Sequence, residues 1–326
     1  MNPFTYQRAV DAHDALSKAS RSGASFIAGG TDFMQLWKTG ISAPDLVVDI
    51  SRLPLDTITT HEHGITIGAL ARMSDVADHP DIRQGYPVIG EALLASASPQ
   101  VRNAATIGGN LLQRTRCLYF RSGSLPCNKR EPGSGCGAQD GENRQNAIFG
   151  ASALCAATHA SDLAVALVAL DARVRLVGRD GERTLLLEDF FRSPDTQPEH
   201  DTVIAPGELI VAIDVPGRAW TCHSYYLKIR DRASFEFAVV SVAVALDVVD
   251  GRIRAARVAA GGVGTKPWRL RACEAALVGA QPDAAAFAMA ARLAGEGAQP
   301  LRRNVFKVAL LERAVLRALK TVRGEP

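Results

Sequence analysis

Several features that would assign this sequence to a common class are missing from it. No apolar run in its 326 residues is long enough to cross a bilayer, so we expect no membrane span. The start, Met1 to Tyr6, has no positively charged stretch followed by an apolar one, and we expect no signal peptide there. The net charge is only +3 and the basic residues are dispersed, which argues against a nucleic-acid partner.

Cysteine is also scarce. Six cysteines are too few for a disulfide-stabilised scaffold in a chain of this length. The G-x-G-x-x-G fingerprint of Rossmann dinucleotide binding is absent, and so is any clear pairing of a nucleophile with a base, so we expect no catalytic residue. What remains is an ordinary globular composition, 47% hydrophobic and 22% charged, in a chain long enough for two domains.

Two glycine-rich turns carry the first positive signal. The first, Gly29-Gly30-Thr31-Asp32, follows a short apolar strand at 25–28 and precedes a helical segment at 33–37. Glycines let the backbone approach a ligand closely, and the free N–H groups at a helix start bind phosphate. Taken alone, this stretch is a weak signal and favours a β-turn that binds nothing.

The second turn is Thr106-Ile107-Gly108-Gly109-Asn110. Two such turns in one domain would supply two sets of backbone donors, which suits a pyrophosphate held from two sides. Asp162 begins an apolar helix at 163–170. Its carboxylate is either a helix cap or a group that also accepts from a ligand hydroxyl.

Four of the six cysteines fall in one polar, glycine-rich insertion from about Leu112 to Ala157: Cys117, Cys127, Cys136 and Cys155. Their spacings lack the C-x2-C pair of zinc ribbons and bacterial ferredoxins. Arg116, Lys129 and Arg130 could offset the negative charge of a thiolate-bound cluster. Composition leaves three interpretations open, namely a [4Fe–4S] cluster, a structural zinc ion, and two disulfides or free thiols.

The apolar periodicity predicts an α+β fold in two domains. We expect a first domain over 1–217 and a second domain over 222–326 that packs helices on one face of an antiparallel sheet. Helices are expected at 5–20, 33–37, 73–79, 85–97, 163–170, 269–279, 282–295 and 301–323. Strands are expected at 25–28, 44–50, 53–60, 64–69, 174–177, 183–187, 208–216, 225–230, 238–249 and 252–261.

Four segments together resemble the FAD-binding subunit of molybdenum hydroxylases, the xanthine dehydrogenase and carbon monoxide dehydrogenase flavoprotein family. They are AGGTD at 28–32, TIGGN at 106–110, THASD at 158–162 and YLKIR at 226–230. The resemblance covers essentially the whole chain in order. The usual His-Pro-Ser-Asp segment has Ala160 in place of proline, which removes no ligand.

The cysteine-bearing insertion is similar to that of bacterial periplasmic aldehyde oxidoreductases, whose FAD subunit carries an additional [4Fe–4S] cluster. A related insertion occurs in 4-hydroxybenzoyl-CoA reductase. The resemblance implies an FAD-binding domain of the vanillyl-alcohol-oxidase type in two subdomains, at about 1–55 and 56–217, followed by a C-terminal α+β domain of the CO dehydrogenase flavoprotein type.

The resemblance also implies a role for individual residues. The pyrophosphate of FAD would be wrapped by Phe26, Ile27, Ala28, Gly29, Gly30, Thr31, Asp32, Phe33 and Met34. The other side would be held by Thr106, Gly109 and Asn110. Asp162 would accept from ribityl or ribose hydroxyls, and Ile210 and Lys228 would lie against the isoalloxazine end. The cluster would be ligated by Cys117, Cys127, Cys136 and Cys155.

The implied function is that of an electron-transfer subunit in a heterotrimer. A large molybdenum-cofactor subunit would oxidise an aldehyde, and a small [2Fe–2S] subunit would pass the electrons to the FAD of this chain and on to an external acceptor. Export with a partner subunit would place the complex in the periplasm, with the cytoplasm as the alternative. Other interpretations are a molybdenum hydroxylase with a xanthine, CO or aromatic acyl-CoA substrate, a zinc-stabilised nucleotide-binding scaffold, and an independent flavin oxidase.

Overall fold

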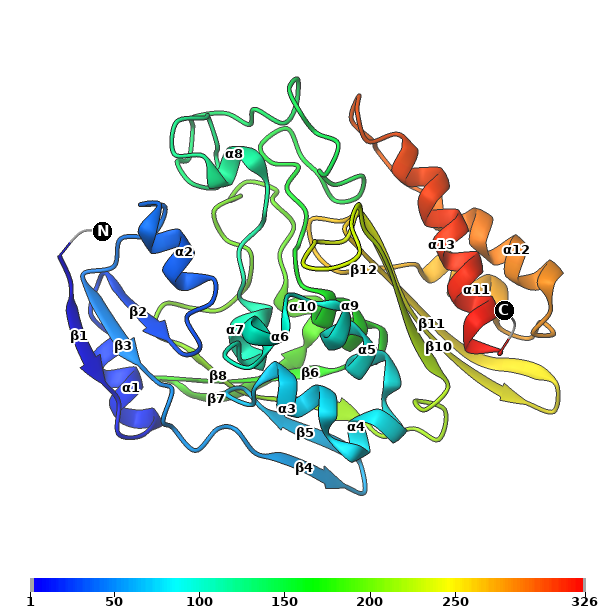
Figure 1. The fold of residues 1–326 in the computed structure, drawn as a ribbon, viewed down its shortest axis with the longest axis horizontal. Helices are drawn as coiled ribbons and strands as arrows, with labels where there is room; N and C mark the ends of the chain where they lie inside the picture. The colour runs from blue at the N-terminus through cyan, green and yellow to red at the C-terminus, as the bar shows by residue number, and fades with distance from the viewer. Residues whose placement is uncertain (1–2, 325–326) are drawn as a thin grey trace.

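Three sheets follow one another along the chain, each with its own helices (Figure 1). The computed structural model describes residues 3–324. The mixture of one parallel and two antiparallel sheets with packed helices confirms the predicted α+β class. The domain boundaries remain a prediction, although each sheet falls within one predicted unit.

The first sheet is parallel and has the order β1-β3-β2. It consists of β1 (Thr5–Arg8), β2 (Ala24–Ile27) and β3 (Leu46–Asp49), with α1 (Ala12–Ala19) after β1 and α2 (Phe33–Lys38) after β2. The helix predicted at 5–20 is wrong over its first part. Thr5–Arg8 pairs with the fully buried β3, and that pairing overrides the helical spacing. The helix starts only after Asp11, whose side chain accepts the N–H of Asp14.

The second sheet is antiparallel and has the order β4-β5-β8-β6-β7. Its strands are β4 (Ile58–His61), β5 (Gly64–Gly68), β6 (Arg173–Gly178), β7 (Gly181–Leu186) and β8 (Leu209–Pro216). Its helices are α3 (Met73–Asp78), α4 (Pro80–Gly85), α5 (Pro87–Ala95), α6 (Pro99–Arg102), α9 (Asp162–Ala169) and α10 (Leu187–Phe190). The strands predicted at 53–60 and 64–69 form the hairpin β4-β5, and those predicted at 174–177 and 183–187 form the hairpin β6-β7.

The third sheet has the order β12-β11-β10-β9 and carries its helices on one face (Figure 1). Its strands are β9 (Ser224–Ile229), β10 (Val240–Val249), β11 (Arg252–Gly261) and β12 (Trp268–Arg269). The helices are α11 (Arg271–Leu277), α12 (Ala284–Arg292), the short 3-10 helix η1 (Leu293–Gly295) and α13 (Phe306–Val322). The three antiparallel strands and three helices predicted for this region are confirmed.

Helix α9 joins the second and third sheets. Every residue from Asp162 to Ala169 is buried, because the helix packs against α5 on one side and against β10 and β11 on the other. A helix that is apolar all round needs such a position. Consequently Asp162, at its first turn, lies in the interior between the two sheets.

The cysteine insertion projects beyond the sheets and follows α7 (Ile107–Leu111) (Figure 1). It contains the short helix α8 (Leu118–Arg121). The Arg130 guanidinium holds the loops together by donating to the backbone carbonyls of Tyr119 and Ser122, both at 2.6 Å. The insertion returns onto the third sheet, where the Phe149 ring stacks on Trp268 at 5.3 Å. No helix within residues 3–324 has both the length and the apolarity needed to cross a bilayer.

Candidate functional site

The first glycine turn lies against the segment that precedes the second. A Cβ on Gly29 would lie 2.0 Å from the backbone oxygen of Ala104, so only glycine fits there. Gly30 has a φ of +68°, which favours glycine as well. Within residues 3–324, the backbone N–H groups of Gly29, Gly30, Thr31 and Asp32 donate no hydrogen bond to the protein. The first turn therefore offers a row of free donors to an anion.

The second glycine turn was predicted as a turn, but the structure makes it the start of a helix: Thr106 is the N-cap of α7, and Ile107 to Asn110 belong to that helix. Two of its amides are already used, since Ile107 N–H donates to Ala71 O at 3.0 Å and Gly108 N–H to Ala69 O at 2.8 Å. Gly109 N–H makes only a long bond of 3.4 Å to the Thr106 hydroxyl. Of the two expected sets of backbone donors, the second is therefore largely engaged within the protein. The second turn contributes close backbone approach instead.

Two adjoining cavities lie along these turns. One, of about 200 Å³, is lined by Phe26, Ile27, Ala28, Gly29, Gly30, Thr31, Asp32, Phe33, Thr106, Gly109 and Ile210 among others. The other, of about 400 Å³, is lined by Thr31, Asp32, Gly109, Asn110, Asp162 and Lys228 among others. Thr31, Asp32 and Gly109 line both, so the cavities meet at the turns and form one groove.

Most of the predicted cofactor-binding residues are therefore brought together. Met34 is the exception, because it lines neither cavity and its side chain lies under the turn at Gly30. Ile210 and Lys228 were both expected against the isoalloxazine end of FAD. The structure places Ile210 in the smaller cavity and Lys228 in the larger one. They line different parts of the groove.

Asp162 sits in a buried polar network at the edge of the larger cavity. Its carboxylate accepts from the Lys228 ammonium at 2.8 Å, the Tyr226 hydroxyl at 2.6 Å and the Ser96 hydroxyl at 2.8 Å. Burial and the neighbouring carboxylate raise the pKa of Tyr226 well above its usual value, so this phenol stays a donor. The helix cap is provided by Ser161, whose hydroxyl accepts the N–H of Ala164. Sequence reasoning missed Ser96 and Tyr226 as partners of Asp162, since no motif spacing relates them to it.

The Asp162–Lys228 pair gives a prediction on stability. We expect Lys228→Met to lower the free energy of unfolding of the flavin-free protein by about 3–5 kcal/mol, because it leaves the buried Asp162 carboxylate without its cation. Lys18→Met is the control, since the Lys18–Asp14 pair on α1 is more exposed and its loss should cost much less. Urea denaturation measures both. Equal losses in the two variants would contradict a buried charge pair at Asp162.

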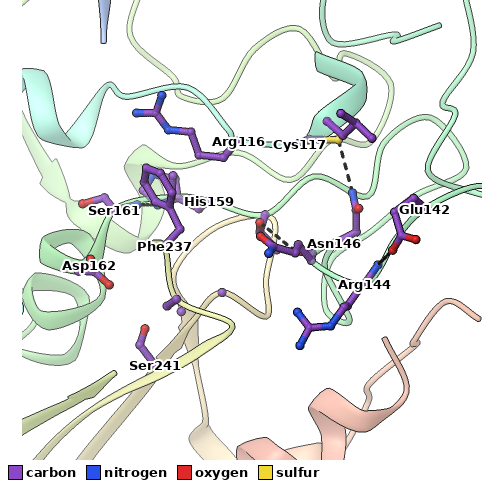
Figure 2. A pocket seen from close by; sticks show the side chains of 17 residues that line it. Arg116, Cys117, Glu142, Arg144, Asn146, His159, Ser161, Asp162, Phe237 and Ser241 are labelled. Carbon is purple, nitrogen blue, oxygen red and sulfur yellow. Dashed lines mark hydrogen bonds between the residues drawn. The ribbon is translucent and has the colours of Figure 1, made fainter. Parts of the chain in front are cut away.

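The four insertion cysteines lie near one another but form no disulfide. None of Cys117, Cys127, Cys136 and Cys155 is bonded to another cysteine. Cys127 and Cys136 pair as an isolated β-bridge. The Asn146 side-chain amide points at the sulfur of Cys117, at 3.6 Å (Figure 2). Within residues 3–324, no three His, Cys, Asp or Glu side chains gather closely enough to hold a single metal ion.

Burial makes these thiols hard to ionise without a cation. It raises the pKa of Cys155 to about 12, and it raises the pKa of Cys117 too. The positive charge of the Lys129 ammonium partly offsets this by lowering the pKa of Cys155. A coordinated metal removes the proton from a thiol outright, so buried thiols at such positions can serve as ligands. Nearby, burial lowers the pKa of His159 to about 4, which leaves its imidazole neutral.

The groove is elongated, with free amides at its centre, an apolar end and a charged end, and this arrangement suits a dinucleotide. Because the Rossmann fingerprint is absent, the protein belongs to another class of dinucleotide-binding fold. Residues 2–218 match the family model described as FAD binding domain in molybdopterin dehydrogenase. Residues 225–322 match the CO dehydrogenase flavoprotein C-terminal domain. The chain belongs to this family, the FAD-binding subunits of molybdenum hydroxylases, which are oxidoreductases.

Individual relatives agree with the family. The chain is 46% identical over 328 residues to the aldehyde oxidoreductase FAD-binding subunit PaoB of Escherichia coli (strain K12), with all of both chains aligned. It is 28% identical to the glyceraldehyde dehydrogenase medium chain of Sulfolobus acidocaldarius, over 85% of this chain and 81% of the relative. Carbon monoxide dehydrogenase from Hydrogenophaga pseudoflava shares the fold, with a TM-score of 0.78 at 24% identity over 99% of this chain and 98% of that one. The predicted family and its FAD cofactor are confirmed.

Proposed function

We propose that this chain is the FAD- and [4Fe–4S]-carrying electron-transfer subunit of a molybdenum-dependent aldehyde oxidoreductase. The observation that carries the proposal is the 46% identity, over the full length of both chains, to a relative named as the FAD-binding subunit of an aldehyde oxidoreductase. The cysteine insertion lies within the matched region. Because the proposed chemistry on the aldehyde needs a molybdenum centre, we assign no catalytic residue to this chain.

The groove fits FAD on observations of its own. Gly109 lines both cavities, and a Cβ on it would meet only the Thr106 hydroxyl at 3.0 Å, so any side chain there would fill the groove. The free amides of Gly29 to Asp32 would hold the diphosphate, and Asp162 and Lys228 would close one end. FAD supplies one- and two-electron redox chemistry when bound. The residues named here bind it and orient it.

The four cysteines fit a [4Fe–4S] cluster better than they fit zinc. Four thiolates complete the usual ligand set of such a cluster, and they carry long, irregular spacings within loops. A single zinc ion would need its ligands closed tightly around one point. Lys129 is buried beside them and forms an ion pair with Asp201. Whether the cluster relays electrons depends on its potential, which the environment sets.

The proposed partners are a large subunit with the molybdenum cofactor and a small [2Fe–2S] subunit, which together with this chain make a heterotrimer. Electrons would enter from the small subunit and leave to an external acceptor. We propose the periplasm as the compartment, reached by export with a partner subunit, with the cytoplasm as the alternative.

Cofactor analysis of the complex tests the proposal. Purification without air, together with the products of neighbouring genes, should give one FAD per chain and about four iron and four sulfide in this subunit. A colourless chain with stoichiometric zinc would overturn the cluster. Aldehyde turnover by this chain alone would overturn its assignment as an electron-transfer subunit.

A further inference from the structure

Two arginines of the cysteine insertion reach back to the first glycine turn. Arg116 Nη1 donates to Asp32 Oδ1 at 2.6 Å, and Arg121 Nη2 donates to the same oxygen at 2.9 Å. The backbone N–H of Arg114 donates to the other Asp32 oxygen at 2.9 Å. Arg116 and Arg121 both line the larger cavity of the groove. The insertion therefore forms part of the wall of the flavin site.

The charges in this cluster do not balance. Two guanidinium groups face one carboxylate, which leaves one net positive charge beside the free amides of the first turn. Arg116 is largely buried, and its guanidinium lies 4.8 Å from the centre of the Phe237 ring. Besides Asp32, its Nη groups make only long contacts of 3.5 Å in the described part of the chain, to the side-chain oxygens of Gln35 and Gln113. A buried, partly unpaired cation is costly unless an anion completes the site.

We propose that Arg116 and Arg121 bind the diphosphate of FAD together with the free amides of the first glycine turn. Arg121 already donates through Nε to Thr115 O at 2.9 Å and through Nη2 to Arg114 O at 3.0 Å, which leaves its Nη1 for this ligand. Arg116 offers Nη2, whose contact within residues 3–324 is a long one of 3.5 Å to the Gln113 side chain. Guanidinium N–H groups form charge-assisted hydrogen bonds with phosphate oxygens. From the sequence, Arg116 was expected only to offset the charge of a cluster. Its guanidinium instead points away from Cys117 and lies by Phe237 (Figure 2).

The same geometry links the two proposed cofactors. Cys117 follows Arg116 directly, and the backbone N–H of Arg121 donates to the backbone oxygen of Cys117 at 3.0 Å. Ordering of Cys117 by a metal cluster would therefore fix both arginines at the groove. Since coupling between two bound ligands is reciprocal, a bound cluster strengthens FAD binding and bound FAD strengthens the hold on the cluster. This second step rests on the proposed cluster, whereas the first does not.

The test compares ligands with and without phosphate on the full chain freed of flavin. Arg116→Gln and Arg121→Gln should each raise the Kd for FAD about tenfold to a hundredfold and flatten its dependence on salt. The Kd for ADP should rise by a similar factor, and the Kd for riboflavin, which has no phosphate, should stay the same. Arg144→Gln is the control, because Arg144 pairs with Asp231 and lines neither cavity of the groove.

Each outcome decides between diphosphate binding and mere support of the turn. An unchanged Kd for FAD, or an equal loss for riboflavin and FAD with the salt dependence intact, would overturn the proposal. Wild-type protein that binds no FAD would instead overturn the proposed function.

For the coupling, Cys136→Ser should raise the Kd for FAD in the wild-type background but not in the Arg116→Gln/Arg121→Gln variant. Equal effects in both backgrounds would contradict the coupling.

Discussion

Gly109→Val is expected to yield a folded protein without flavin. Gly109 is the one position of the second turn that lines both cavities, and beyond its own helix only the Thr106 hydroxyl lies within 4 Å of the place that a Cβ would take. A valine would project its methyl groups into the space where the diphosphate must approach the backbone. The flavin content released on denaturation, per mole of protein, measures the effect.

The matched control is Gly85→Val. Gly85 ends α4, its φ lies outside the left-handed region, and no heavy atom lies within 4 Å of where its Cβ would be. It lines neither cavity, so flavin content should be unchanged. Gly29→Ala would be a poor comparison, because its Cβ would clash with Ala104 and disturb the fold itself. Full flavin occupancy in Gly109→Val, with a normal thermal transition, would show that the second turn does not face the cofactor.

The two turns also show how far sequence reasoning reaches. Two glycine pairs predicted two segments of one binding site, and the structure places both segments on one groove. The sequence could not show that Ile107 and Gly108 donate their amides to Ala71 and Ala69. Those acceptors lie in a segment whose path is set by the second sheet. Donor availability depends on tertiary contacts that no local pattern encodes.

Long-range charge pairs are the other part that was not predictable. Asp32 precedes Arg116 by more than eighty positions, and nothing in the spacing relates them. Likewise nothing in the sequence shows that Ile210 and Lys228 come from β8 and β9, in two different sheets, so their shared position at the isoalloxazine end stays a prediction. The strands at 238–249 and 252–261, by contrast, were predicted correctly, and they pair as the β10-β11 hairpin, because a turn and its two flanking strands are specified locally.

Cys136→Ser is expected to abolish the cluster and leave FAD in place at saturating flavin. A serine hydroxyl is a poor ligand for iron compared with a thiolate, and a four-cysteine set has no spare member. Cys136 also pairs with Cys127 across an isolated bridge, so loss of the metal should loosen the loops around both. Iron and sulfide should fall to background, and limited proteolysis should cut within the cysteine insertion faster than in the wild type.

Cys222→Ser is the control for the loss of a thiol as such. Cys222 is exposed and lies outside the insertion, so its replacement should change neither iron content nor proteolysis. The groove turns keep their own support in Cys136→Ser, because Gly29 packs on Ala104 and Thr106 caps α7 without help from the cysteines. Flavin is therefore expected to remain, bound more weakly if Arg116 and Arg121 lose their order. Iron content equal to that of the wild type would remove Cys136 from the ligand set, and with it the reason to place a cluster in this insertion.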